Sequence, residues 1–143
     1  MKYDFKGITT EELSFKLNRV KIEPNQRLDI KPQFSRQIRK TNENAKLIFV
    51  SLSVKIESTE TEPKPFNITT TLVGVYELEK EPSQQEERAF VIEATQMLYP
   101  YLRAAVTNLT AQAYITPLNL PVISGPIFPE DRDVYAFAPG DVN

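Results

Sequence analysis

The chain has 143 residues, of which 41% are hydrophobic and 25% are charged, and its formal net charge is −2. This length and composition predict one globular domain, residues 1–143, that is large enough to bury its own core. No basic cluster exceeds the short group Arg36, Arg39 and Lys40, so we expect no nucleic-acid partner.

Two residue types that carry much enzyme chemistry are missing, because the sequence contains no cysteine and no histidine. Disulfides, thiolate nucleophiles, Ser–His pairs and ordinary zinc sites are therefore excluded. We expect no metal, no cofactor and no enzymatic activity. No apolar run reaches the length of a signal peptide or of a bilayer span, so we also expect a cytoplasmic protein that does not insert into membranes.

The first part of the chain, from about residue 10 to residue 80, alternates between apolar and polar residues, as strands do. A first strand is expected over residues 13–22, with a bulge or bend at residues 18–19. A second, over residues 28–34, should be short or interrupted, because Pro32 cannot donate to a sheet.

The third and fourth strands have the clearest patterns. The apolar face of the third consists of Ile48, Val50, Leu52, Val54 and Ile56. That of the fourth consists of Phe66, Ile68, Leu72, Tyr76 and Leu78. Four consecutive strands without an intervening helix predict an antiparallel meander, and the rest of the chain must cover one face of this sheet.

A helical pattern comes after the strands. Ser83 and Glu86 have the spacing of a capping box, which marks a helix start. A stripe that should cover the sheet consists of Leu98, Leu102, Ala105, Leu109 and Ala113, with Arg103, Thr107 and Thr110 opposite. Pro100 should kink or break the helix. The predicted fold class is therefore α+β, a four-stranded antiparallel sheet with one long helix on one face.

The residues after the helix form an apolar, proline-containing loop, TPLNLPVI, residues 116–123. Its two prolines favour an extended path. Its apolar side chains are too many for a solvated loop, so they must pack against something. The helical part and this loop together cover about residues 84–137.

The run YPYLRAAVTNLTAQAYITPLNLP, residues 99–121, resembles the SecB family of protein-export chaperones. In that family an aromatic-Pro-Tyr-x-Arg helix leads into a Pro-x-Leu-Asn-Leu-x-Pro type loop. The preceding EATQM, residues 93–97, is similar to the short stretch before that helix. The resemblance implies a four-stranded sheet with helices on one face, assembled as a dimer of dimers whose helices lie between two sheets. It also implies a holdase, a chaperone that binds unfolded or precursor polypeptides without nucleotide.

On this resemblance, the loop is a wall of a client-binding groove. The wall residues are Leu118, Leu120, Pro121, Val122 and Ile123, and Phe34 and Phe128 are added from outside the matching stretch. Tyr101 and Arg103 match the helix motif and are expected to have structural roles. From the residues alone, the loop could equally pack on its own domain or contact another subunit.

The sequence departs from the family pattern in two places. The family closes with a second amphipathic helix, whereas the prolines here leave room only for a short C-terminal helix over residues 130–137. The family also contacts the translocation motor SecA through an acidic outer sheet face. Glu57, Glu77 and Glu79 would form that surface here, but Lys16 and Lys55 dilute it, and a solvated mixed surface explains these charges equally well.

Three functions remain as hypotheses. The first is an ATP-independent holdase, with or without a role in protein export. The second is a dedicated chaperone or binding module for one partner, such as an antitoxin. The third is an enzyme or small-molecule binder that would use Glu86, Glu87 and Glu93, but acidic residues at a helix start already favour the helix dipole. We prefer the first.

Overall fold

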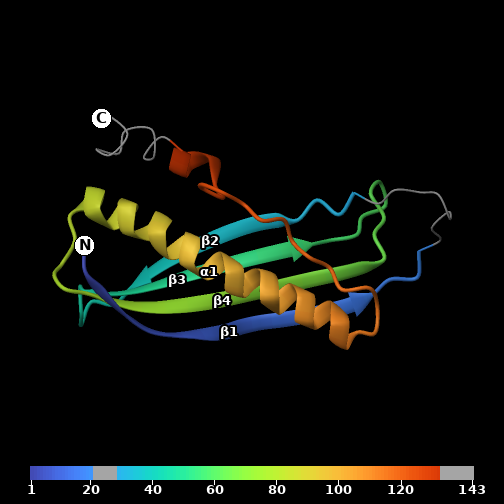
Figure 1. Ribbon diagram of the computed structural model, residues 1–143, viewed down its shortest axis with the longest axis horizontal. Coiled ribbons are helices and arrows are strands. Elements are labelled where there is room, and N and C mark those ends of the chain that lie inside the picture. The colour runs from blue at the N-terminus through green and yellow to red at the C-terminus, as the bar shows by residue number, and fades with distance from the viewer. Residues whose placement is uncertain (21–28, 133–143) are drawn as a thin grey trace.

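The computed structural model describes residues 1–20 and 29–132 of the chain. The elements in chain order are β1 (Tyr3–Leu17), β2 (Gln33–Lys40), β3 (Leu47–Ile56), β4 (Phe66–Leu78), α1 (Gln84–Gln112) and a 3₁₀ turn, η1 (Pro129–Asp131). The four strands form one antiparallel sheet, and α1 lies diagonally across one of its faces (Figure 1). The predicted α+β class is confirmed.

The order of strands in the sheet is β1-β4-β3-β2, so the predicted meander is wrong for β1. β2, β3 and β4 follow one another as expected, but β1 pairs with β4 along its whole length, from Tyr3 opposite Leu78 to Leu17 opposite Phe66. This is the order of a Greek key. The long connection over residues 18–32 allows it, because only a short turn would force β1 and β2 to be neighbours.

The bounds of the first two strands also differ from the prediction. β1 begins at Tyr3, and its register shifts lie between Phe5 and Gly7 and between Thr10 and Glu12, not at residues 18–19. Its first half alternates too weakly to be recognised without its partner β4. β2 begins after Pro32, where the backbone can donate to β3 again. Residues 21, 22 and 28, which we expected in strands, and residues 133–137 of the expected short C-terminal helix lie outside the described residues.

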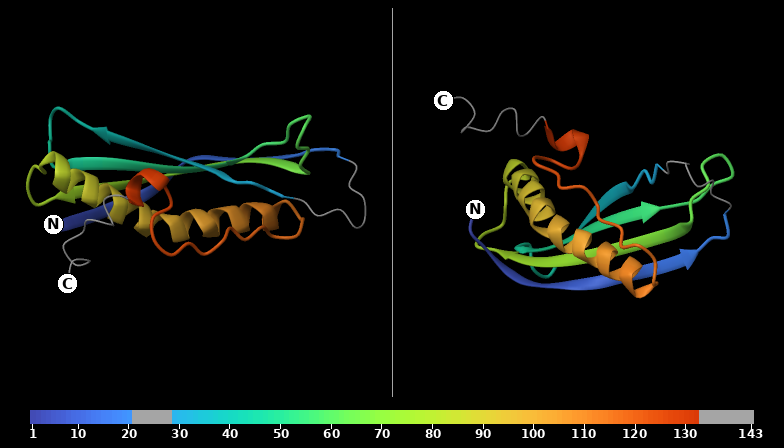
Figure 2. Two further views of the ribbon diagram at one scale, coloured as in Figure 1. Left: turned by 90° about the horizontal axis from the view of Figure 1, so that it is seen from above. Right: turned by 45° about the vertical axis from the view of Figure 1, so that its right-hand side comes forward.

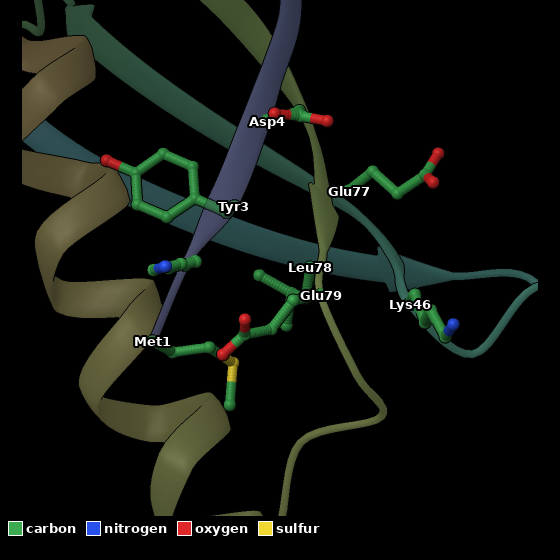
Figure 3. A pocket seen from close by; sticks show the side chains of 8 residues that line it. Met1, Tyr3, Asp4, Lys46, Glu77, Leu78 and Glu79 are labelled. Carbon is green, nitrogen blue, oxygen red and sulfur yellow. The ribbon is translucent and has the colours of Figure 1, made fainter.

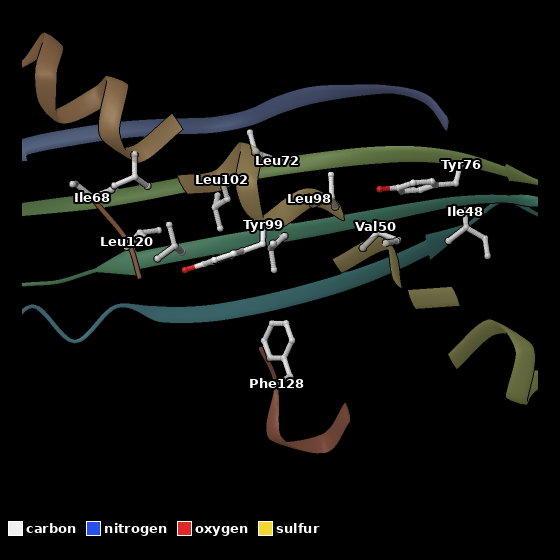
Figure 4. Close-up of a cluster of buried hydrophobic side chains, with 14 of the residues drawn as sticks. Ile48, Val50, Ile68, Leu72, Tyr76, Leu98, Tyr99, Leu102, Leu120 and Phe128 are labelled. Carbon is white, nitrogen blue, oxygen red and sulfur yellow. The ribbon is translucent and has the colours of Figure 1, made fainter. Parts of the chain in front are cut away.

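The core lies between α1 and the sheet. All the predicted apolar residues of β3 and β4 are buried there, and those of β3 are 0% exposed. From the helix, Leu98, Leu102 and Val106 are also 0% exposed and pack in the same cluster (Figure 4). The prediction that the helix covers the sheet is therefore confirmed. Within the described residues, no element covers the opposite face (Figure 2).

The helix α1 begins as predicted and does not break at Pro100. Ser83 accepts from the backbone N–H of Glu86, and the Glu86 carboxylate accepts from the backbone N–H of Ser83. The helix continues through Pro100 to Gln112, and its axis bends near the middle (Figure 2). A bend is expected, because proline lacks the N–H of one helical hydrogen bond and its ring crowds the preceding turn.

The predicted stripe is correct at Leu98 and Leu102 and only partly correct from Ala105 onward. Val106 and Thr110 are fully buried, whereas Ala105, Leu109 and Ala113 are only half-buried. A threonine can replace an apolar residue here because the Thr110 hydroxyl donates to the carbonyl oxygen of Val106, 3.0 Å away. Among the described residues, no helix is long and apolar enough to span a membrane.

Truncation of the core tests this packing. We expect Leu102→Ala to lower the free energy of unfolding by about 2–5 kcal/mol, because it leaves a cavity between α1 and the sheet. Urea denaturation followed by circular dichroism measures the loss. Ala89→Ser, at an exposed position in the first half of the same helix, is the control and should change stability by less than about 0.5 kcal/mol. Equal losses in the two variants would contradict the assigned helix face.

Candidate functional site

The loop that we predicted to form a groove wall is part of a longer post-helix segment, residues 115–132. After the helix ends, this segment turns back and runs beside α1 toward β2, so that it lies on the helix side of the molecule (Figures 1 and 2). The reversal occurs at Tyr114, whose backbone has a φ of 60°, the left-handed conformation common just after a helix. The predicted wall therefore lies against its own helix.

A series of hydrogen bonds from helix side chains holds the start of this segment. The Tyr99 hydroxyl donates to the carbonyl oxygen of Pro121 (2.6 Å), and Arg103 Nε donates to that of Leu120 (3.0 Å). The Thr107 hydroxyl donates to that of Leu118 (3.0 Å).

Thr110 also binds the segment, but as the acceptor of a hydrogen bond. Its buried hydroxyl accepts from the backbone N–H of Leu118, 2.8 Å away. Four backbone groups of residues 118–121 are thus hydrogen-bonded, although the segment does not belong to the sheet.

The series fits because the two repeats have nearly the same length. Four helical residues rise about 6 Å, and two extended residues span about 6.6 Å. Helix positions 103 and 107 therefore reach carbonyl groups 120 and 118 in register. Prolines at positions 117 and 121 carry no N–H, so the segment presents fewer donors that need a partner.

Tyr99 remains a donor at neutral pH. Burial raises the pKa of its hydroxyl, and the Arg103 guanidinium acts in the opposite direction. The ring of Tyr99 also packs edge-on against Phe34 of β2, with the ring centroids 5.8 Å apart. One helix residue thus joins the segment to the edge of the sheet.

The structure divides the seven predicted groove residues into three groups. Leu120 and Phe128 are buried in the core, at 3% and 8% exposed. Leu118, Ile123 and Phe34 are half-buried against that core.

The third group, Pro121 and Val122, is exposed, and Val122 is 78% exposed. Of the predicted wall, only these two residues present apolar side chains to solvent, and they follow a backbone that helix side chains hold.

The end of the segment is held by an ion pair that sequence reasoning missed. The two terminal nitrogens of Arg36, on β2, donate to the two oxygens of the Asp131 carboxylate, at 2.7 Å from Nη1 and 3.0 Å from Nη2. The same guanidinium donates to the Thr95 hydroxyl (3.0 Å) and lies 4.6 Å from the centre of the Phe128 ring. The one signal in the sequence is that Arg36 shares the phase of Phe34 and Ile38, where an apolar side chain is expected.

Arg103 and Tyr101, the two helix residues expected to have structural roles, differ in whether they contact the rest of the fold. Arg103 has such a role, since its Nε holds Leu120. Tyr101 is 50% exposed and points away from the core.

The predicted acidic surface is not one patch. Glu77 and Glu79 line an open depression of about 580 Å³ together with Asp4, Lys2 and Lys46 (Figure 3). Glu57 comes directly after the C-terminal end of β3, whereas Glu77 lies beside its N-terminal end. The rise per residue of a strand puts Glu57 about 30 Å from Glu77. There it lies 3.9 Å from Lys55.

The three glutamates of the enzyme hypothesis have separate structural surroundings. Glu86 caps the helix, and Glu87 forms an ion pair with Lys40 at 2.6 Å. Glu93 lies beside Tyr3. Burial, and then the nearby Glu93 carboxylate, raise the pKa of the Tyr3 hydroxyl. Across residues 1–20 and 29–132, no cluster of three or more acidic side chains could hold a metal ion.

The buried hydroxyl of Thr110 offers a test of how the segment is held. Thr110→Val keeps the shape but removes the acceptor of the Leu118 N–H, so we expect a loss of about 1–3 kcal/mol in the free energy of unfolding. Thr107→Val is the matched control and should cost less than about 1 kcal/mol, because this site is half-buried and water can replace the lost donor. Denaturation curves that show no difference between the variants would contradict this role.

Comparison with known proteins finds one matching family and several relatives. The family described as Preprotein translocase subunit SecB matches residues 4–125. Protein-export protein SecB of Anaplasma marginale (strain Florida) is 35% identical over 80 residues, which cover 55% of this chain and 46% of that relative. The chain thus spans about half the length of this relative. The uncharacterized protein MJ0357 of Methanocaldococcus jannaschii is 26% identical over 121 residues, 84% of this chain and 77% of that protein.

A solved structure has the same fold. It is the Mycobacterium tuberculosis SecB-like chaperone Rv1957 in complex with a ChAD peptide from the Rv1956 HigA1 antitoxin. The TM-score is 0.72 with 20% sequence identity, over 87% of this chain and 93% of that chain. The family match over most of the chain, the helix-and-loop motif and this fold agree, and the chain belongs to the SecB family.

Proposed function

We propose that this protein is an ATP-independent chaperone that holds non-native polypeptides against the exposed part of the post-helix segment. The observation that carries the proposal is a solvent-exposed apolar stretch, Pro121 and Val122, at the end of a backbone that four helix side chains hold at residues 118, 120 and 121. Membership of the SecB family supports it.

The physical basis is a preformed apolar surface. Because the backbone of the wall is already ordered, a bound polypeptide loses its own conformational entropy but causes little further loss in the protein. Unfolded chains expose the apolar side chains that such a surface can cover. No nucleotide is needed for this step, since binding and release follow the folding of the client.

Self-association is part of the same proposal. The outward face of the second half of α1 carries no charged residue, and its exposed residues are Pro100, Tyr101, Ala104, Asn108, Ala111 and Gln112. On β1, the exposed apolar residues are Phe5, Ile8, Leu13 and Leu17. Apolar area of this kind is typical of subunit contacts. A dimer of dimers, with helices between two sheets, would cover both surfaces.

The dedicated-partner hypothesis stays open beside the general one. Its specific support is the similarity in fold to a SecB-like chaperone solved with an antitoxin peptide. Affinity purification from native extract separates the two hypotheses. One partner at stoichiometric ratio would support a dedicated chaperone, and a heterogeneous set of proteins would support a general holdase.

A role in protein export is a further part of the proposal. Contact with the translocation motor SecA would use the depression around Glu77 and Glu79, where Asp4 adds a third carboxylate. Glu57 would take no part in the same contact, because it lies at the other end of the sheet. The names of relatives matched over part of their length support the export role.

A charge placed in the wall tests client binding. We expect that about ten times more Val122→Asp than wild-type protein is needed to suppress the aggregation of a chemically denatured client. The reason is that a bound client would have to cover a carboxylate at this exposed position. Ser124→Asp adds the same charge at another exposed position of the segment and should have little effect. If wild type and both variants suppress aggregation equally, or none does, the proposal is wrong.

A charge on the helix face tests assembly. The wild type should have a light-scattering mass near four times 16.4 kDa. Ala104→Glu should lower this mass, since a carboxylate between packed helices would lose its hydration. Gln85→Glu, exposed in the first turn of α1, is the control. A monomeric wild type would contradict the proposed assembly.

A further inference from the structure

The contacts of Arg36 form a binding site that the chain itself fills. The Arg36 side chain is 13% exposed and the Asp131 side chain is 4% exposed. Thr95, which donates to the helix carbonyl of Val91 and accepts from Arg36, is 1% exposed. The guanidinium is thus bound by a carboxylate, a hydroxyl and the face of the Phe128 ring, all largely removed from water. Figure 4 shows Phe128 on the β2 side of the buried cluster.

Such a site is not explained by stability alone. Taking an arginine and an aspartate out of water costs several kcal/mol, and apolar residues of similar volume often stabilise a fold at least as well. Arg36 is an especially unfavourable choice, because its neighbours in phase, Phe34 and Ile38, pack against the core. A planar guanidinium fits the paired oxygens of a carboxylate, and this gives geometric selectivity.

The chain segment that fills this site is hydrogen-bonded mainly at its two ends, while Ile123 and Ile127 between them pack partly against the core. Its first attachment is the series of bonds that ends at Pro121, and its second is the Arg36 site, with an added bond from Arg88 to the carbonyl oxygen of Glu130 (2.9 Å). Within the described part of the chain, residues 122–127 make no hydrogen bond to the helix or the sheet. The bound end can therefore leave without breaking a continuous backbone ladder.

We propose that the Arg36 site is a recognition site for partner polypeptides that carry an aromatic residue followed three positions later by a carboxylate. Phe128 and Asp131 are the internal occupant of this pattern. A partner segment with the same pattern exchanges with them, placing its ring on the guanidinium and its carboxylate on the two nitrogens. This inference rests on the proposed polypeptide binding and names the chemistry that one class of partner must have.

Competition from the internal occupant sets the expected behaviour. A tethered segment has an effective concentration on the order of millimolar. A free peptide with the same contacts therefore binds the wild type only weakly. It binds well once the internal occupant is weakened.

The test uses a fluorescent peptide with the chain's own sequence GPIFPEDR, residues 125–132. We expect the variant Phe128→Ala/Asp131→Asn to bind it at least tenfold more tightly than wild type, by fluorescence anisotropy. Addition of Arg36→Gln should abolish this gain. Glu130→Ala changes an exposed side chain of the same segment and should bind as weakly as wild type. Peptides with alanine for phenylalanine, or asparagine for aspartate, should bind no variant.

A second measurement does not depend on emptying the site. The chain has no cysteine, so Ile127→Cys gives a single thiol beside Phe128. Millimolar GPIFPEDR should raise the rate of thiol labelling several-fold, because the internal segment is displaced, and the peptide with asparagine for aspartate should not. Failure of both binding to the emptied site and faster labelling would overturn the inference.

The client assay separates this inference from the proposed function. If the wild type suppresses aggregation of a denatured client but the peptide neither binds nor displaces, the inference is wrong and the proposed function stands. If the wild type has no effect on aggregation, the proposed function is wrong whatever the peptide does.

Discussion

The hydrogen bonds between the helix and the extended segment after it determine which apolar side chains of that segment face solvent. Tyr99, Arg103 and Thr107 bind the carbonyl groups of Pro121, Leu120 and Leu118. Positions 103 and 107 match 120 and 118 because four helical residues and two extended residues have nearly equal length. An apolar loop without such bonds would collapse onto the core or fray. Here the backbone is held, so Leu120 points into the core and Val122 stays in solvent. The same contacts that order the segment leave part of its apolar surface free.

The sheet depends on a similar separation of roles. β3 and β4 supply the covered apolar faces, while β1 and β2 lie at the two edges. β1 leaves apolar side chains exposed beside the helix, which suits contact between subunits. β2 places Arg36 where a carboxylate can reach it from the post-helix segment. Stability therefore comes mainly from the centre of the sheet, and the edges remain available for binding.

The two proposed binding surfaces are linked by one chain segment. Its first half forms the wall around Val122, and its second half fills the Arg36 site. A partner that displaces Asp131 would free the second half of the segment, while the bonds from Tyr99, Arg103 and Thr107 keep its backbone in place as far as Pro121. General apolar binding and recognition of a specific aromatic and acidic pattern are thus compatible in one protein.

The sequence by itself determined the elements whose signals are local. The alternation in β3 and β4, the capping box at Ser83 and the helix-and-loop motif predicted the α+β class and the family. It could not determine the place of β1 beside β4, because strand pairing depends on contacts far apart in the chain. The buried positions of Thr110 and Arg36 were missed for the same reason, since each polar group is satisfied by a partner that only folding brings near. Which loop residues are buried and which are exposed was decided by the tertiary structure, because it depends on the register between a helix and an extended chain.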